Sequence, residues 1–195
     1  RIVNKAQAIS PDDALTHYLR GYMAKRLRND LNQSLVAFER AIAIDPNLGV
    51  AHNYIGQIKV FLGRANEAAE HTLKAIQLSP RDPELARWYY QLALIYIHQQ
   101  RDDEAVESAR RSVQINPSLR YPYRVLAAAL ALSGRVDEAR MVAAEMLRRY
   151  PNLWCDLAFL TSHASNGKVA PGWREAFLEF PDRFVVGTDT FTPER

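Results

Sequence analysis

Cysteine is nearly absent from this chain of 195 residues, in which Cys155 is the single example. One thiol cannot form a disulfide within the chain. Cys155 follows Trp154, and free cysteine behaves as a small apolar side chain that proteins commonly bury. We therefore expect Cys155 to be a small buried residue rather than a reactive thiol.

Long hydrophobic runs are also missing. No stretch approaches the roughly 18–20 consecutive apolar residues that cross a bilayer as a helix. Hydrophobic residues nevertheless make up 48% of the chain, and the mean hydropathy is -0.28, as for a soluble packed protein. These values predict a soluble protein without a membrane partner, which we expect to lie in the cytoplasm.

An excess of charge of one sign is the third absence. The 25 Lys and Arg residues nearly balance the 22 Asp and Glu residues, which leaves a formal net charge of +3. Charges of both signs are intermixed along the chain, without the basic blocks that mark nucleic-acid-binding tails. We therefore expect no nucleic-acid partner.

Residue patterns that support catalysis are missing too. The sequence has no Gly-x-Ser-x-Gly element, no phosphate-binding loop and no histidine paired with Cys155. Five histidines occur without short metal-ligand spacings, and each is expected on a helix surface or half-buried: His17, His52, His71, His98 and His163. The sequence therefore predicts no enzyme, no metal site and no cofactor.

What the chain does have is a repeating period. Segments such as "RAIAIDP" (40–46) and "KAIQLSP" (74–80) end on one of five prolines: Pro11, Pro46, Pro80, Pro117 and Pro151. The steps between these prolines are 35, 34, 37 and 34 residues. A nearly constant period of this length indicates an array of stacked structural repeats.

Two further features recur in the same phase. Small residues stand 24 or 25 positions before a proline, where two helices can approach closely: Gly21, Gly56, Ala93 and Ala127. A turn such as "LGRANEAAE" (62–70) follows, in which Gly can end one helix and acidic residues can begin the next. Each unit should therefore consist of two antiparallel helices, and neighbouring units should share a core.

This combination resembles the tetratricopeptide repeat. The resemblance implies an all-α, right-handed superhelical solenoid of antiparallel helix pairs over residues 1–152. Four repeats are expected at 12–46, 47–80, 81–117 and 118–151, and residues 1–11 resemble the end of a preceding repeat, as if the chain came from a longer array. Two departures are an extra residue within "RLRNDLNQ" (26–33) and three extra residues in "PRDPELA" (80–86).

Longer segments are similar to one setting of these repeats. The segments "FERAIAIDPNLGVAHNYIGQIKVFLGRANEA" and "AIQLSPRDPEL" resemble the C-terminal repeat regions of bacterial adenylate cyclases and transcriptional regulators. That resemblance implies a regulatory module of a larger signalling protein. It brings no catalytic residue with it.

Residues 153–195 do not continue the repeat pattern. We expect a strand or short helix at 153–160, a polar loop at 161–172, an amphipathic helix at 173–180 and an apolar run at 183–187.

The segment "PDRFVVGTD" (181–189) resembles a late strand of TIM-barrel amidohydrolases, which implies that Asp189 lies near a metal. One carboxylate does not make a catalytic zinc site, which needs about three protein ligands. We favour an atypical cap, because terminal repeats need a cover over their apolar edge. The aromatic residues expected to cover the last repeat are Trp154, Phe159, Trp173, Phe177 and Phe180.

The remaining candidate site is the concave face, which the first helix of each pair lines in this family. Matching each small residue to the family's eighth position assigns these groove residues by resemblance: Tyr18, Tyr22, Lys25, Val50, Asn53, Gln57, Arg87, Tyr90, Leu94, Tyr121 and Arg124. Tyr and Arg are enriched at binding hot spots, and cations suit carboxylates. The alternative interpretation is packing tyrosines with ordinary surface charges.

Three functions remain open. We favour a protein-interaction scaffold whose groove binds a peptide or partner domain, with an acidic or C-terminal peptide as the expected class. The second is a regulatory or oligomerisation segment, which would associate with itself through an open N-terminal edge. The third, a fragment of a metal-dependent amidohydrolase, is the most distant.

Overall fold

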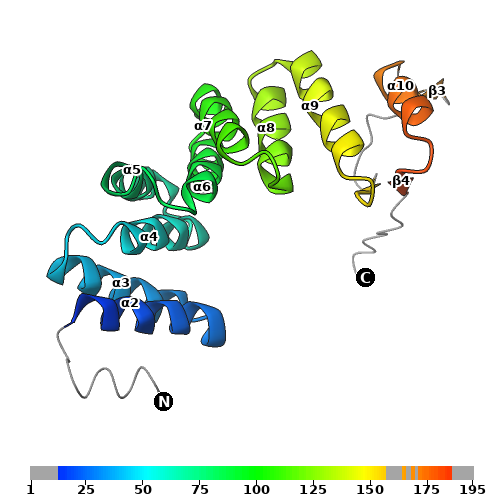
Figure 1. Ribbon diagram of the computed structural model, residues 1–195. Coiled ribbons are helices and arrows are strands. Elements are labelled where there is room, and N and C mark those ends of the chain that lie inside the picture. Colours follow the sequence, from blue (N-terminus) through cyan, green and yellow to red (C-terminus); the bar gives the residue numbers. More distant parts are fainter. Residues whose placement is uncertain (1–12, 157–163, 166–167, 170, 186–195) are drawn as a thin grey trace, which may run out of the picture. The chain divides into compact units, whose positions relative to one another are not determined.

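The computed structural model describes residues 13–156, 164–165, 168–169 and 171–185 (Figure 1). Contacts divide the chain into two compact units, Arg1–Ala139 and Arg140–Arg195, here called unit 1 and unit 2. This division falls earlier in the chain than the predicted end of the array at residue 152. No described helix combines the length and hydropathy that a bilayer-spanning segment requires.

Unit 1 is built from helix pairs that follow each other along the chain (Figure 1). The all-α solenoid of antiparallel helix pairs predicted from the sequence is confirmed. The elements are α2 (Ala14–Met23) continued by the π-helical turn η1 (Ala24–Arg28), α3 (Leu31–Ile44), α4 (Gly49–Phe61), the 3-10 turn η2 (Ala65–Glu67), α5 (Ala69–Leu78), α6 (Leu85–His98), α7 (Asp102–Ile115), α8 (Arg120–Leu132) and α9 (Val136–Arg149), whose second part belongs to unit 2.

Each turn within a pair contains one residue with a positive φ. Glycine occupies this position at Gly63 (φ 75°) and Gly134 (φ 77°), where it meets no steric penalty. Asn29 (φ 52°) and Gln100 (φ 58°) take the same role in the first and third pairs. The predicted glycine turn is therefore present in two pairs, and other side chains tolerate the strained conformation in the remaining two.

The recurring proline lies two residues beyond the end of each second helix. Helix α3 ends at Ile44 before Pro46, and α5 ends at Leu78 before Pro80. Proline cannot continue a helix because it lacks the backbone N–H and its ring clashes with the preceding turn. The proline period in the sequence therefore marks the start of each connection to the next pair.

The small residues of the sequence pattern lie where helices cross. A Cβ atom on Gly21 would stand 3.0 Å from the ring of Phe38. Around this crossing, a cluster joins the first two pairs and contains Leu35, Phe38, Ala41, Ala51, Ile55 and Ile58. Ala93 is likewise fully buried, whereas Ala127 is only partly buried. Neighbouring pairs thus share a core, as expected for stacked repeats.

Unit 2 contains the end of α9, helix α10 (Pro171–Glu179) and four strands of two residues. The predicted helix at 173–180 is present as α10. Strand β1 (Cys155–Asp156) pairs in parallel with β4 (Phe184–Val185), and β2 (Ala164–Ser165) pairs antiparallel with β3 (Lys168–Val169). The C-terminal segment is thus a mixture of helix and short strands.

Side-chain contacts within unit 2 connect α10 with the end of α9. Arg148 forms an ion pair with Glu179, and its guanidinium lies 5.8 Å from the ring centre of Phe180. Arg183 donates hydrogen bonds to the backbone oxygens of Tyr150 (2.5 Å) and Leu153 (2.6 Å). These contacts connect the C-terminal segment with the end of α9 and the residues that follow it.

Several predictions about the ends of the chain are not met or not described. Trp154, which we expected to cover the last repeat, is 55% exposed. Phe159, His163, Asp189 and the repeat end at 1–11 lie outside the described residues, as do the side chains of Cys155 and Trp173. The cap therefore stays a prediction.

Candidate functional site

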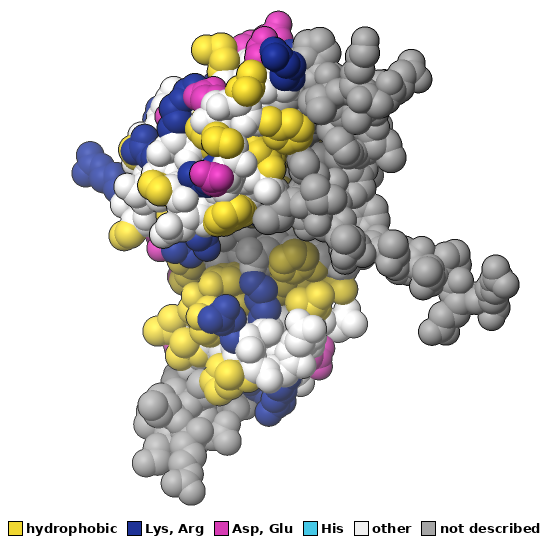
Figure 2. All heavy atoms as spheres, turned by 90° about the vertical axis from the view of Figure 1, so that its right-hand side faces the viewer, with side chains coloured by type: hydrophobic (Ala, Val, Ile, Leu, Met, Phe, Trp, Pro, Cys, Tyr) yellow, Lys and Arg dark blue, Asp and Glu magenta, His cyan; other side chains and the backbone are white. Residues whose placement is uncertain are grey.

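A groove of about 700 Å³ crosses the first helices of the four pairs in unit 1. All the residues assigned to the concave face from the sequence line this one groove: Tyr18, Tyr22, Lys25, Val50, Asn53, Gln57, Arg87, Tyr90, Leu94, Tyr121 and Arg124. Lys and Arg side chains stand among hydrophobic ones in the lower part of the face shown in Figure 2. The structure thus brings together residues that are up to 106 positions apart in the sequence, from Tyr18 to Arg124.

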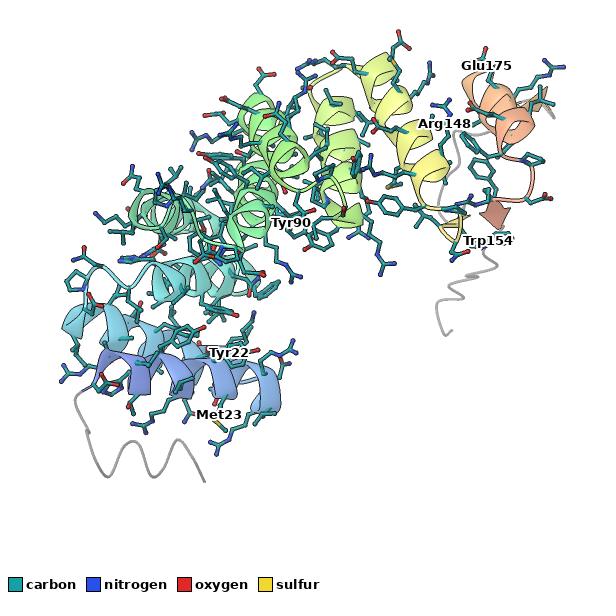
Figure 3. The ribbon with its side chains drawn as sticks, viewed as in Figure 1. Tyr22, Met23, Tyr90, Arg148, Trp154 and Glu175 are labelled. Atoms are coloured by element: carbon teal, nitrogen blue, oxygen red, sulfur yellow. The ribbon has the colours of Figure 1, made fainter. Side chains whose placement is uncertain are left out.

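Tyrosines of α2 and α4 form one wall of the groove. The ring centres of Tyr18 and Tyr54 are 6.0 Å apart, and those of Tyr22 and Tyr54 are 5.8 Å apart in an edge-to-face arrangement. Tyr54 also stacks on the buried ring of Phe38 at 5.1 Å. Figure 3 shows Tyr22 on the side of α2 that is turned towards α4, with Met23 on the other side. This packing fixes the wall before any ligand arrives.

The floor of the groove contains a buried amide. Asn53 is 8% exposed, and its backbone oxygen accepts a hydrogen bond of 3.0 Å from Gln91 Nε2. Gln91 Nε2 also donates to Thr72 Oγ1 at 3.2 Å. The side-chain oxygen of Asn53 and the hydroxyl of Tyr121 are buried and have no hydrogen-bond partner among the described residues. Buried polar atoms are normally paired, so these two atoms are unsatisfied in the free protein.

The extra residue of the first repeat appears as the π-turn at the end of α2. The N–H of Asn29 bonds to the carbonyl of Ala24, which closes a loop one residue wider than in an α-helix. Lys25 lies in this turn, and its Nζ donates to Gln57 Oε1. The same nitrogen lies 5.0 Å from the ring centre of Tyr54 and 5.8 Å from that of Phe61. Cation–π contacts of this kind hold the ammonium group in the groove.

Burial shifts the titration of groups in this half of the groove. It lowers the pKa of Lys25, and the neighbouring charge of Arg26 lowers that pKa further. Burial also raises the pKa of Tyr54 to about 12, with a smaller contribution from Tyr18. Both directions follow from poor solvation of the charged form. The tyrosine therefore stays neutral at physiological pH, and no carboxylate of the described residues forms an ion pair with Lys25.

Arginines and tyrosines line the other half of the groove. The rings of Tyr90 and Tyr121 meet edge to face with centres 4.6 Å apart (Tyr90 is labelled in Figure 3). Arg87 lies 5.9 Å from the ring centre of Tyr121 and forms an ion pair of 2.7 Å with Glu84. Arg124 is exposed and comes from the next pair of helices. Aromatic area and positive charge thus adjoin each other here.

The balance of charge in the groove is positive. Its cations are Lys25, Arg26, Arg87 and Arg124, and among the described lining residues Glu84 is the only acidic one. Glu84 pairs with Arg87, so the other cations are left without a carboxylate in the groove. This arrangement favours a ligand that brings negative charge.

Sequence reasoning missed several lining residues, among them Arg26, Tyr54, Glu84, Trp88 and Gln91. Tyr54 stands four positions after Val50, a spacing that places both on one helix face, so a signal for it existed. Arg26 stands four positions after Tyr22, so the same spacing carried a signal for it as well.

No group of three or more His, Cys, Asp or Glu residues capable of holding a metal ion occurs in the part of the chain that the structure describes. A second hollow of about 680 Å³ lies on α6 and α7, with Tyr89, Glu107 and Arg111 among its lining residues. Acidic and basic side chains are mixed there, which distinguishes it from the positive groove.

Comparison with known proteins finds one repeat family that is similar to part of this chain. The tetratricopeptide repeat family matches residues 47–118. The mitochondrial import receptor subunit TOM70 of Homo sapiens is 30% identical over 86 residues, which are 44% of this chain and 14% of TOM70. The chain therefore spans only a small part of that longer relative.

Solved structures share the fold over most of the chain. YrrB, a TPR protein with an unusual peptide-binding site, has a TM-score of 0.69 and 20% identity, over 77% of this chain and 76% of YrrB. MamA has a TM-score of 0.68 and 20% identity, over 75% of this chain and 84% of MamA. Residues 47–118 thus match the tetratricopeptide repeat, and the chain has the fold of a tetratricopeptide solenoid. The resemblances to cyclase-linked repeats and to amidohydrolases stay predictions.

Proposed function

We propose that the chain is a protein-interaction module that binds an extended peptide segment of a partner protein in the groove of unit 1. The observation that carries the proposal is the combination of fixed aromatic walls with two buried, unpartnered polar atoms on Asn53 and Tyr121. A rigid wall loses little conformational entropy on binding, and unpaired polar atoms gain hydrogen bonds that they lack in the free protein.

The polar atoms suit the backbone of an extended segment. The side-chain oxygen of Asn53 accepts hydrogen bonds, which the N–H groups of an extended peptide can supply. The hydroxyl of Tyr121 can donate to a peptide carbonyl or accept from an N–H. Because every residue except proline carries both groups, these contacts would hold a peptide without selecting its sequence.

Charge and aromatic area would supply the selection. The groove contains more cations than carboxylates, so a segment with Asp, Glu or a free C-terminal carboxylate is favoured. Tyr90 and Arg124 come from consecutive pairs and are of the residue types that dominate binding energy at interfaces. We therefore assign the strongest contacts to this half of the groove.

A direct test begins with the peptides that the protein selects. A displayed library of random ten-residue peptides with free C-termini is enriched on the full chain, and affinities of enriched peptides are measured by calorimetry. The double variant Tyr90→Ala with Arg124→Ala should weaken binding by about 2–4 kcal/mol, in the range of hot-spot losses.

A matched control removes the same two residue types from the outer side. Tyr89 directly precedes Tyr90 on α6, and Arg111 is an exposed arginine of α7; both line the second hollow. Tyr89→Ala with Arg111→Ala should leave the affinity within about 0.5 kcal/mol, as expected for substitutions outside the contact. Loss of binding in the control, with normal binding in the groove variant, would show that recognition belongs to the outer side.

The wider setting of the module is a second part of the proposal. Its place in a larger regulatory protein, and self-association through the N-terminal edge, stay predictions. Exposed apolar side chains on the first pair, Leu15 and Val36, support self-association because such groups favour burial. Sedimentation at several concentrations would test it, since a mass independent of concentration and equal to one chain contradicts it.

A further inference from the structure

A chain of hydrogen bonds crosses the second helix pair and ends in the connection that precedes α4. Lys59 Nζ lies 3.1 Å from His71 Nε2, and His71 Nδ1 lies 3.4 Å from His52 Nδ1. The Nε2 atom of His52 lies 3.0 Å from the backbone oxygen of Pro46. We call these four residues the histidine chain. It joins α4, α5 and the connection between the first two pairs.

The groups at the two ends of the histidine chain fix the direction of every bond in it. An ammonium group only donates, and a backbone carbonyl only accepts. Lys59 therefore donates to Nε2 of His71, and the carbonyl of Pro46 accepts from Nε2 of His52. His71 then carries its hydrogen on Nδ1 and donates it to Nδ1 of His52. Both rings are neutral in this arrangement, and each of their four nitrogens has a partner.

The histidine chain has no place for a further proton. A proton added to either ring puts two hydrogens on one junction, either between Lys59 and His71 or between the two rings. Two N–H groups that point at each other cannot bond, and the positive charges repel. One hydrogen bond of the chain must therefore break when a histidine becomes charged.

The surroundings of His71 also oppose a positive charge. Lys59 is 6% exposed, and the side chain of His71 is 17% exposed. Burial and the charge of Lys59 lower the pKa of His71 to about 4. The other titratable groups that face the ring are His52 of α4, Glu67 of η2 and Glu70 of α5. The two carboxylates act in the opposite direction, but they do not outweigh burial.

The residues that follow the two histidines meet at the floor of the groove. Asn53 follows His52, and Thr72 follows His71. Gln91 Nε2 of α6 donates both to the backbone oxygen of Asn53 at 3.0 Å and to Thr72 Oγ1 at 3.2 Å. A change in the contact between the two histidines therefore reaches a bridge in the groove floor.

We propose that the histidine chain is an acid-sensitive latch, which holds α4, α5 and the Pro46 connection together at neutral pH and opens when the two histidines take up one proton. In an open latch both rings meet water, where imidazole has its ordinary pKa of about 6.5. Between this value and the pKa of about 4 in the closed latch, falling pH raises the ratio of open to closed forms by up to about 300-fold, since each unit is tenfold. Opening would loosen the groove floor in mild acid.

The first measurement is the position of the ring hydrogens at neutral pH. Two-bond nitrogen–proton NMR spectra of the full, isotope-labelled chain show which ring nitrogen carries the hydrogen. The latch requires His71 to carry it on Nδ1 and His52 on Nε2. A His71 ring with its hydrogen on Nε2 would overturn the latch, because Lys59 could not then donate to it. No peptide is needed, so this result is independent of the proposed function.

The second measurement follows the same spectra from pH 7 to pH 4. The signals of His52 and His71 should shift together, and the side-chain amide of Gln91 should shift with the same midpoint, while the far-UV circular dichroism stays constant. The control His98→Gln, which removes an exposed histidine of α6, should leave these changes as they are. A constant Gln91 amide while His71 titrates, or loss of the helical signal at the same midpoint, would overturn the latch.

A variant tests the lysine end of the histidine chain. Lys59→Met removes the donor to His71 and keeps a side chain of similar length in a buried position. The ring of His71 can then carry a hydrogen on Nε2, so its affinity for a proton should rise about tenfold or more. An unchanged tautomer and titration of His71 in this variant would contradict the latch. If Lys59→Met does not fold, the tautomers and the titration of the wild type still decide.

Discussion

The substitution Gly56→Ala, which adds one methyl group, tests how closely α4 and α5 pack. A Cβ atom there would lie 2.4 Å from Thr72 Oγ1 and 2.9 Å from the carbonyl oxygen of Ala68. The hydroxyl can rotate away, but the carbonyl belongs to the start of α5 and accepts from the Thr72 N–H at 3.3 Å. Relief therefore requires α4 and α5 to move apart.

The magnitude follows from two opposing effects. Overpacking a helix contact costs about 1–3 kcal/mol, whereas replacing Gly by Ala inside a helix gains up to about 1 kcal/mol. We expect Gly56→Ala to lower the free energy of unfolding by about 1–2 kcal/mol. Urea titration followed by far-UV circular dichroism measures it. A neutral or stabilising result would show that helix propensity alone governs the site, and the close contact would be refuted.

A double-mutant cycle with Thr72→Ala separates the two contacts. Removing Oγ1 takes away the nearest atom, so the double variant should be more stable than additivity predicts by about 1 kcal/mol. Gly56→Ala should also weaken peptide binding, because Thr72 Oγ1 accepts from Gln91, which in turn bonds to Asn53 in the groove floor.

Three further predictions concern single features of the fold. Gln100→Gly should raise the free energy of unfolding by about 0.5–1 kcal/mol, because Gln100 has a φ of 58°, which glycine adopts without strain. Gly134→Ala should lower the free energy of unfolding, because Gly134 has a φ of 77°. Urea titration measures both changes. Burial and the nearby Lys59 lower the pKa of His71 from 6.5 to about 4. Above about pH 6.5 His71 should contribute no pH dependence. Between these two pH values only the unfolded chain takes up the proton, so the free energy of unfolding should fall by up to about 3 kcal/mol from pH 6.5 to pH 4. Thermal melts of His71→Gln over this range should show a smaller slope, and an equal slope would assign the effect to other groups. Deleting residues 153–195 should cause aggregation or a lower melting temperature, and an equally soluble and stable truncation would contradict the cap.

Much of the fold and of the groove could be predicted because the relevant signals are local and repeated. Each proline marks a connection, and each small residue marks a crossing, so the phase of every helix follows from the sequence. Once the phase is known, the resemblance to the tetratricopeptide repeat indicates which residues of each first helix face the groove, and on that basis Tyr18, Asn53 and Tyr121 were assigned to it; all three line the groove.

What could not be predicted depends on geometry that a regular pattern does not contain. The extra residue in 26–33 was visible, but an insertion can widen a helical turn or lengthen a loop, and its sequence does not decide between them. The structure places it in the π-helical turn Ala24–Arg28. The pairing of Cys155 with Phe184 is equally inaccessible, because it joins short segments that are far apart in the chain.

The account depends most on the claim that the groove between the first helices of the pairs binds the peptide. The most direct measurement is an NMR titration of the full, isotope-labelled chain with a peptide that it selects from the library. The account predicts that the largest shifts occur on α2, α4, α6 and α8, and that they include the side-chain amides of Asn53 and Gln57. Shifts concentrated on α3, α5 and α7, with unchanged Asn53 and Gln57 amides, would contradict it.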